Sequence, residues 1–498
     1  MFLKSLKQYL PLVVILLVGI FLRFYNTPDM YYLDADAVRD AIVAHEGAAH
    51  LYFPLSGPFS STGPYTFGPW YYYSLIITAL LFPTPFSPWM FMGVSSLITI
   101  VLMFHIGKLL VSRNFGLFLA AIVAVAPSQI SVATGLSNIN SVPLLATLSL
   151  WLGLQILKKQ RVHFLWYVLL GISLGLGVNA HYQMAGLLFL PLLIWLYKGW
   201  KHIEIVLYLF LGFFITLIPM LIFNLSTQGH TLRGIQEMYQ SRDQIYVANS
   251  WKIYLFQFWP SMVTFVFKTP YVVSLVLFFG VFASLAYSFL RKKLPASMVI
   301  FLLVFAANLL SLRYYWGERS LVYIYYLEPL LLIFTCYVLF SLRLLRWGKL
   351  LVFCLTLPLL GIMLFADSTR LSQTPQKIIQ TEVQLLSAHY PNKKITIYAC
   401  GLSLHNHANA VTYLLSFEKN RIHTEEKIAI TDGRKCHYPS TSEVNFSATN
   451  SAKLIQRVYP PLEKTYLVDF FPASESAIKS ATWSAITTEN IFKKTIHR

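Results

Sequence analysis

Long apolar stretches recur along the first 366 residues, and polar residues are confined to the segments between them. A helix needs about 20 apolar residues to cross the hydrocarbon core of a bilayer. About eleven stretches reach or approach that length. We therefore predict an all-α polytopic membrane protein with about eleven transmembrane helices. They lie near residues 8–25, 88–107, 115–135, 141–157, 163–179, 183–197, 203–224, 270–290, 296–312, 320–341 and 349–366.

The composition agrees with this pattern. Hydrophobic residues make up 56% of the chain and charged residues only 12%, whereas a soluble protein carries about 25% charged residues. The formal net charge of +18 would indicate a nucleic-acid partner on a soluble protein. In a membrane protein, positive charge gathers in cytoplasmic loops instead, so we expect the membrane and no nucleic acid as a partner.

The distribution of charge predicts the orientation in the cell membrane. With the N-terminus in the cytoplasm, Glu204 is the only acid on the cytoplasmic side before residue 366, and the other acids fall on the outer side or at its edge. The first apolar run, from Tyr9 to Phe24, ends in Leu22-Arg23-Phe24-Tyr25 and not in a small-residue cleavage site, which indicates a retained helix. Basic residues fill the predicted cytoplasmic segments: Lys4, Lys7, Lys108, Arg113, Lys158, Lys159, Arg161, Lys198, Lys201, Arg291, Lys292, Lys293, Arg343, Arg346 and Lys349.

Two large outer loops follow from this topology, at residues 26–87 and 226–270. They contain two aromatic-rich apolar stretches, Trp70–Phe82 and Trp251–Phe267. Counting either as a full span would put a basic cluster on the wrong side of the membrane, so we interpret both as interfacial or partly inserted helices.

The C-terminal part of the chain has the composition of a soluble segment. Helical patterns at 374–389 and 407–419 alternate with strand patterns at 394–399, 427–431 and 465–470. We predict a transmembrane domain at 1–366 and a small extracytoplasmic α/β domain at 367–498. Cys400 and Cys436 lie in this domain, as a disulfide or as two free thiols.

An acidic cluster follows the first helix. Asp34, Asp36, Arg39 and Asp40 lie within seven residues, between the apolar runs Met30–Leu33 and Ala41–Ala44. Carboxylates held against an apolar surface pay a desolvation cost that partners or function must offset. If the segment is helical, Asp36, Arg39 and Asp40 share one face at the i, i+3 and i+4 spacings. The alternative is an ordinary solvated loop.

Three Gly-Pro pairs at 57–58, 63–64 and 68–69 stiffen the remainder of this loop. Tyr65 lies between them, and Trp70-Tyr71-Tyr72-Tyr73 follows. Such aromatic residues suit either an anchor at the membrane interface or a wall on which a sugar stacks.

The exit from the first helix, the Asp-x-Asp-x-x-Arg-Asp run and the Gly-Pro segment ending in Trp-Tyr-Tyr-Tyr resemble the first outer loop of the GT-C glycosyltransferases. Within that superfamily the chain most resembles the branch of protein O-mannosyltransferases and lipid A aminoarabinose transferases. The resemblance covers roughly residues 1–340 and leaves the C-terminal part out. It implies a mannosyltransferase-like enzyme of the cell envelope that uses a polyprenyl-phosphate sugar donor.

The resemblance also implies roles for particular residues. In GT-C enzymes an acid of the first outer loop is the catalytic base, often within Asp-Glu. We assign this role to Asp36, with Asp34 as the second candidate, although Ala37 stands where relatives have Glu. Many relatives have a second acid after the third helix, where this chain has Asn138 and Asn140. The missing carboxylate weakens the case for a divalent cation, and we assign no metal ligands.

Other polar residues on the predicted outer face are candidates for substrate binding. His181 and Tyr182 follow the fifth helix, and some relatives have a similar His-Tyr pair; as a lone residue, His181 is more often a structural interface histidine. A phosphate-bearing donor would explain outer arginines, because guanidinium binds phosphate oxygens in pairs. Ion pairs within the loops are the alternative. The charged candidates for substrate binding are Arg39, Asp40, Arg233, Arg313, Glu318 and Arg319, of which Arg39 and Asp40 would also position the base.

The predicted activity is transfer of a hexosyl or pentosyl group from a lipid-linked donor to an acceptor hydroxyl, with inversion. The acceptor is a protein, lipid or glycan. The chain contains no P-loop, zinc-ligand spacing or Gly-x-Ser-x-Gly, which fits a donor that arrives through the membrane. The alternative is a transporter or flippase for lipid-linked sugars, although its charges would lie nearer the bilayer midplane.

Overall fold

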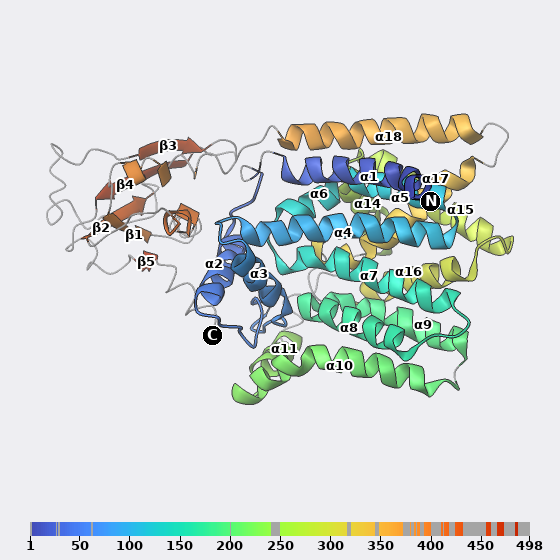
Figure 1. The fold of residues 1–498 in the computed structure, drawn as a ribbon, viewed down its shortest axis with the longest axis horizontal. Helices are drawn as coiled ribbons and strands as arrows, with labels where there is room; N and C mark the ends of the chain where they lie inside the picture. The colour runs from blue at the N-terminus through green and yellow to red at the C-terminus, as the bar shows by residue number, and fades with distance from the viewer. Residues whose placement is uncertain are drawn as a thin grey trace. The chain divides into compact units, whose positions relative to one another are not determined.

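A computed structural model shows a helical protein with a C-terminal sheet (Figure 1). It describes residues 2–25, 27, 30–60, 63–199, 201–240, 250–315, 320–343 and 348–371, and in the C-terminal part 379, 383–384, 386–388, 393–399, 410–411, 413–417, 424–431, 455–459, 466–472 and 484–486. The chain forms two compact units. One comprises residues 1–25, 54–74 and 89–372, and the other comprises 26–53, 75–88 and 373–498.

Each of the eleven predicted stretches contains a helix. Six are long and apolar enough to cross a membrane, or seven if a bent pair is one span, among the residues that the structure describes. The chain is an integral membrane protein, and the count of eleven spans remains a prediction. The helices in these stretches are α1 (Phe2–Phe24), α4 (Ser87–Leu110), α5 (Arg113–Ala124), α6 (Pro127–Thr134), α7 (Val142–Lys158), α8 (Phe164–Ala180), α9 (Phe189–Lys198), α10 (Ile203–Ser226), α15 (Tyr271–Leu290), α16 (Ala296–Arg313), α17 (Glu328–Leu342) and α18 (Gly348–Leu371).

One predicted helix, at 115–135, is wrong as a continuous element. The chain bends by 56° between α5 and α6. Pro127 has no backbone N–H and disfavours the helical conformation in the residue before it. Ala126 is accordingly extended, with φ −68° and ψ 120°.

Shorter helical segments connect or precede the long ones. The predicted interfacial stretches form α3 (Trp70–Leu81) and a run of α13 (Trp251–Ile253), the π-helix η3 (Tyr254–Phe258) and α14 (Trp259–Phe267). The remaining segments are α2 (Ala35–Ala49), α11 (His230–Gln240) and the 3₁₀ turns η1 (Asn138–Ser141), η2 (Tyr182–Leu188) and η4 (Val322–Leu327).

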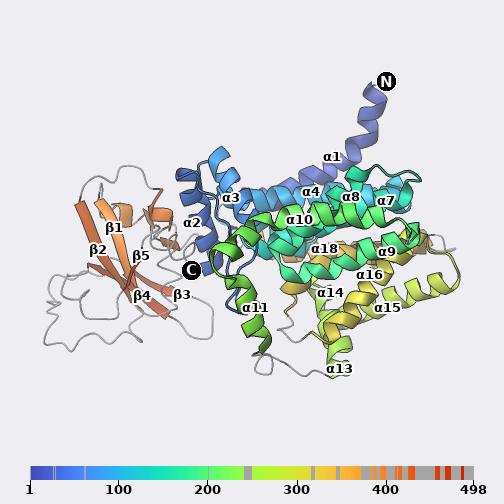
Figure 2. The ribbon, with the colours of Figure 1, turned by 90° about the horizontal axis from the view of Figure 1, so that it is seen from below.

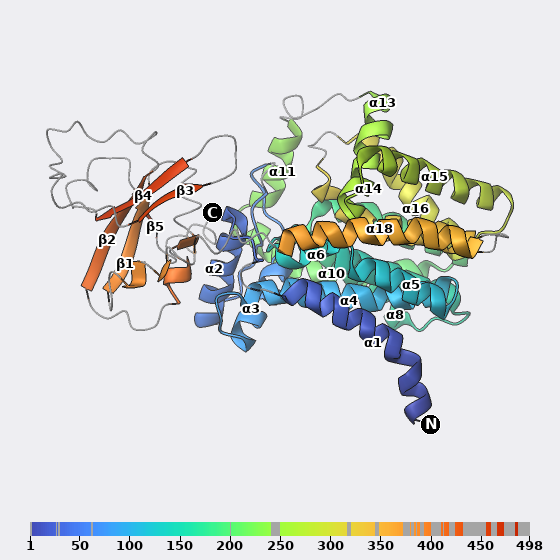
Figure 3. The ribbon, with the colours of Figure 1, turned by 90° about the horizontal axis from the view of Figure 1, so that it is seen from above.

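Glycines let α8 and α10 approach closely, so that the two helices lie side by side (Figure 2). A Cβ built at Gly171 would lie 3.0 Å from the backbone N of Phe213, and one at Gly212 would lie 3.0 Å from the backbone N of Ile172. Both distances are shorter than an ordinary contact between carbon and its neighbours, about 3.5–4.0 Å. Small residues therefore allow backbone-to-backbone packing here, as is common between membrane helices. On another side of the first unit, α18 lies beside α6 (Figure 3) and also contacts α17.

The C-terminal part contains a five-stranded mixed sheet in the order β3-β4-β2-β1-β5. The predicted strands are confirmed as β1 (Lys393–Ala399), β2 (Thr424–Thr431) and β4 (Tyr466–Pro472). β1 and β2 are parallel, and the other pairs are antiparallel. Two short strands, β3 (Ile455–Tyr459) and β5 (Ser484–Ile486), were not predicted. Cys400 and Cys436 lie outside the described residues.

Candidate active site

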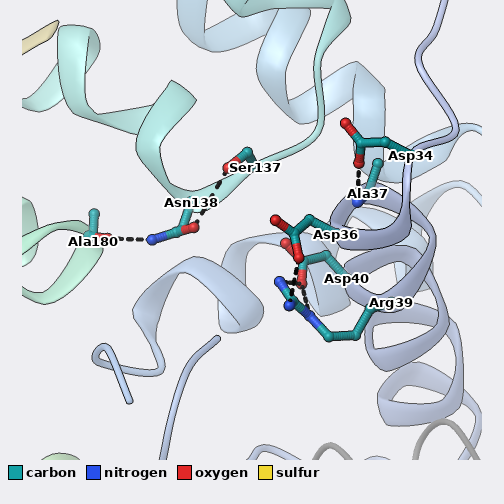
Figure 4. Close-up of polar contacts among 8 residues, drawn as sticks. All are labelled: Asp34, Asp36, Ala37, Arg39, Asp40, Ser137, Asn138 and Ala180. Atoms are coloured by element: carbon teal, nitrogen blue, oxygen red, sulfur yellow. Dashed lines mark hydrogen bonds and ion pairs between the residues drawn. The ribbon is translucent and has the colours of Figure 1, made fainter. Parts of the chain in front are cut away.

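The acidic cluster lies at the start of α2, where Asp34 is the N-cap. Asp34 has an extended backbone, and its Oδ1 accepts a hydrogen bond of 2.8 Å from the N–H of Ala37 (Figure 4). Aspartate is among the preferred N-cap residues because it satisfies an N–H that the helix leaves unpaired. Burial raises the pKa of Asp34, and the Ala37 hydrogen bond opposes part of that rise. One oxygen of Asp34 is therefore already used to begin the helix.

Asp36, Arg39 and Asp40 form the cluster that their spacing predicts. The Arg39 guanidinium lies 2.7 Å from Asp36 Oδ1 and 2.7 Å from Asp40 Oδ1. Its Nε also donates to Asp40 Oδ1 at 2.9 Å (Figure 4). The Asp40 side chain is fully buried, whereas the Asp36 side chain is 66% exposed.

This difference in exposure separates the two carboxylates chemically. Buried Asp40 anchors the guanidinium, since a buried charge needs a partner of opposite sign. The anchored guanidinium then holds one oxygen of exposed Asp36. The first turn of a helix also favours negative charge. Asp36 is thus a fixed, solvent-accessible carboxylate, as a general base requires.

The Gly-Pro loop belongs to the first unit and is fixed by backbone hydrogen bonds. A bridge joins Phe59 and Thr66, and the N–H of Gly57 donates to the carbonyl of Phe67 at 2.9 Å. The N–H of Gly68 donates to the carbonyl of Asn179 at the end of α8, at 2.8 Å. The loop is therefore attached to the end of a long helix.

Side chains from two other elements also hold this loop. The Tyr182 hydroxyl donates to the carbonyl of Thr66 at 2.6 Å, and the Thr66 hydroxyl lies 3.0 Å from that of Thr231 in α11. Tyr65 is buried, with its ring 5.6 Å from the ring of Tyr182. Tyr65 therefore packs within the loop and is not an exposed anchor.

His181 lies between two aromatic rings. Its ring is stacked against Phe67 and Tyr323, with ring centroids 5.1 Å away on each side. Burial lowers the pKa of His181 to about 4, so the imidazole is neutral near pH 7. The residue joins the Gly-Pro loop to η4, a contact that a lone histidine in the sequence does not reveal.

The two asparagines that stand where relatives have a second acid use their amides to hold backbone. Asn138 Nδ2 donates to the carbonyl of Ala180 at 2.7 Å (Figure 4), and Asn140 Nδ2 donates to the carbonyl of Gly135 at 2.8 Å. In the part of the chain that the structure describes, no group of three His, Cys, Asp or Glu residues could hold a metal ion.

The other predicted substrate-binding residues are spread over several elements. Arg233 in α11 donates to the carbonyl of Thr227 at 3.1 Å. The Arg313 guanidinium, at the end of α16, lies 5.1 Å from the centre of the Trp251 ring. Glu318 and Arg319 lie outside the described residues. The alternative of an ion pair within this loop, between Glu318 and Arg319 or Arg313, therefore stays a prediction.

A buried polar network elsewhere in the bundle connects five helices, α1, α4, α5, α6 and α17. Arg23 donates to Ser96 Oγ at 2.8 Å and to the carbonyl of Ala124 at 2.8 Å. Gln129 donates to Glu328 Oε1 at 3.0 Å, and Ser96 donates to the carbonyl of Gln129 at 3.0 Å. The network satisfies carbonyls at the break between α5 and α6, which explains how the membrane bundle accommodates that break.

Comparisons with known proteins find one family model and several solved structures that match the chain. The family described as dolichyl-phosphate-mannose-protein mannosyltransferase has a sequence model that matches residues 68–223. No curated protein sequence matches the chain.

Solved structures match over most of the chain. ArnT from Cupriavidus metallidurans, bound to undecaprenyl phosphate, has a TM-score of 0.58 at 12% identity, covering 92% of this chain and 97% of its own. The apo oligosaccharyltransferase of Archaeoglobus fulgidus has a TM-score of 0.53 at 12% identity. The match covers 82% of this chain and 64% of the oligosaccharyltransferase chain. A third match is the archaeal oligosaccharyltransferase AglB from Archaeoglobus fulgidus, in complex with an inhibitory peptide and a dolichol-phosphate. Its TM-score is 0.51 at 13% identity, and the match covers 100% of this chain and 78% of the AglB chain.

Proposed function

We propose that this chain, which has the fold of the GT-C membrane glycosyltransferases, transfers a sugar from a polyprenyl-phosphate donor to an acceptor hydroxyl on the outer face of the membrane. The observation that carries the proposal is the exposed Asp36 carboxylate, held by an arginine that is itself anchored on a buried aspartate. A solvated surface loop has no need of this arrangement.

In the proposed reaction, Asp36 is the general base. The acceptor oxygen attacks the anomeric carbon while its proton passes to the Asp36 carboxylate. The bond between that carbon and the lipid phosphate oxygen breaks, and the phosphate leaves with the electron pair. A single displacement of this kind inverts the anomeric centre. Arg39 and Asp40 fix the base, and Asp34 begins the helix that carries it.

The donor assignment rests on chemistry and on the neighbours. Two of the neighbouring structures are described as bound to a lipid phosphate, one to undecaprenyl phosphate and one to a dolichol-phosphate. Arg233 and Arg313 are guanidinium groups that could meet the charge of a leaving phosphate. An apolar groove of about 400 Å³ between α8, α9 and α10, lined by residues such as Leu174, Trp195 and Phe213, suits part of an isoprenoid tail.

The test is transfer by purified protein in reconstituted vesicles. Each vesicle preparation would contain one radiolabelled polyprenyl-phosphate sugar and a mixture of protein, lipid and glycan acceptors. We expect label to appear on an acceptor, with release of unglycosylated lipid phosphate in equal amount. If label crosses the bilayer while it remains on its lipid, the protein is a flippase and the transferase proposal is wrong.

A further inference from the structure

The face of α2 away from the acidic cluster carries His45. His45 follows Asp36 by nine residues, which places the two about 180° apart around a helix with 3.6 residues per turn. His45 is partly buried, and its ring contacts two aromatic rings from the C-terminal part of the chain. The ring centroids lie 6.0 Å from Tyr413 and 4.7 Å from Phe417.

Tyr413 and Phe417 form one cluster with the end of α3. Their own rings lie 5.3 Å apart, edge to face, and Tyr413 is buried. The Tyr413 hydroxyl donates to the carbonyl of Pro85, which follows α3. That same carbonyl accepts a hydrogen bond from His45. One backbone oxygen therefore joins α2 to the C-terminal part.

The division of the chain into compact units agrees with these contacts. Residues 26–53, which include α2, group with 75–88 and with the C-terminal 373–498. Within this unit the Tyr31 and Phe86 rings lie 5.7 Å apart, and Gly47 leaves room for Ile76. By its contacts, the helix that carries Asp36 thus belongs with the C-terminal part.

We infer that the C-terminal part positions the catalytic helix, with Tyr413 and Phe417 as positioning residues that act through His45. This inference rests on the proposed function of Asp36. The aromatic cluster fixes the rotation and depth of α2 from one side, and Asp36 projects from the other. Because a displacement of a reacting group by 1 Å can lower a rate by about 100-fold, loss of this contact should lower kcat.

The test compares Tyr413→Ala and Phe417→Ala with Tyr413→Phe. Either alanine variant should lower kcat for transfer by about 10-fold or more, with KM for the lipid donor within about 2-fold of wild type. Tyr413→Phe keeps the ring and should recover most of kcat. Ser416→Ala is the control on the same segment: Ser416 is exposed and its hydroxyl donates to the backbone carbonyl of Tyr413, so the variant keeps both rings and should have the kcat of wild type.

A second measurement separates positioning from loss of folding and from loss of the proposed function. Hydrogen exchange in residues 35–49 should be about 10-fold faster in Tyr413→Ala, with exchange in α8 and α10 unchanged. Wild-type exchange in 35–49, or faster exchange with wild-type kcat, would overturn the inference. If the wild-type protein transfers no sugar, the proposed function fails, and the exchange of 35–49 alone then decides whether the C-terminal part holds α2.

Discussion

Gly68 lies where the Gly-Pro loop meets the end of α8, and a side chain there has no space. A Cβ built at Gly68 would lie 2.5 Å from the Cβ of Asn179 and nearer still to its Oδ1 and Cγ. An ordinary carbon contact is about 3.5–4.0 Å, so Gly68→Ala creates an overlap of about 1 Å. Rotation of the Asn179 side chain cannot relieve it, because Asn179 Cβ is fixed to the helix backbone.

The overlap should separate the loop from α8 by about 1 Å. Overpacking of this kind costs about 1–3 kcal/mol. The separation also stretches the 2.8 Å hydrogen bond from Gly68 N–H to the Asn179 carbonyl. We therefore expect a lower Tm in detergent, measured by loss of the monodisperse peak after heating, and lower transfer activity in vesicles.

A double-mutant cycle with Asn179 and a control substitution at another glycine test whether this one contact causes the effect. The three atoms nearest to the built Cβ all belong to the Asn179 side chain, so Gly68→Ala should be far less damaging when Asn179 is already glycine. Gly280→Ala is the control, because nothing lies within 4 Å of a Cβ built at Gly280; it should leave Tm unchanged or raise it slightly. A Gly68→Ala protein with the Tm and activity of Gly280→Ala would refute this reasoning.

Three further perturbations follow from the contacts. Arg39→Met leaves the buried Asp40 carboxylate without its guanidinium, so we expect a loss of about 3–5 kcal/mol in the free energy of unfolding, measured by denaturant titration. Tyr182→Phe removes the hydrogen bond to the Thr66 carbonyl and should cost about 1–3 kcal/mol, seen as a lower Tm. Burial lowers the pKa of His45 from 6.5 to about 4, so the fold favours the neutral ring. The stability that the neutral His45 ring contributes to the fold is fully present above pH 6.5 and is lost as the pH falls towards 4. The Tm of wild type should therefore fall more steeply between pH 7 and 5 than that of His45→Phe, by an amount worth about 2 kcal/mol at pH 5.

The helices of the bundle could be predicted because each is a long apolar run, which the low charge content makes easy to recognise. The break at Ala126 could not be found by counting apolar residues, because the run continues across Pro127. The signal was available in the Ala-Pro step, which disfavours a helix at the residue before proline. The strands β3 and β5 were missed because each is short and lacks strong alternation.

The acidic cluster could be predicted in part. The i, i+3 and i+4 spacings placed Asp36, Arg39 and Asp40 on one face, and the structure shows both ion pairs. The sequence did not show that Asp34 is an N-cap, because that depends on where the helix begins. The burial of Asp40 depends on contacts with residues distant in sequence, so the sequence did not show which aspartate is buried. The hydrogen bond from Tyr182 to the Thr66 carbonyl likewise joins residues far apart in the chain. The contacts of His45 could not be predicted, because its aromatic partners lie more than 350 residues away in the sequence.

The central claim is that Asp36 is the base, and the most direct measurement compares transfer by Asp36→Asn and Asp34→Asn with wild type in the same vesicles. Asparagine retains the size of both side chains and can still accept the Ala37 hydrogen bond as an N-cap, so both variants should fold, which their Tm would confirm. We expect Asp36→Asn to lose at least about 100-fold in kcat, and Asp34→Asn to retain most of it. Full transfer by Asp36→Asn, or loss in Asp34→Asn alone, would contradict the assignment.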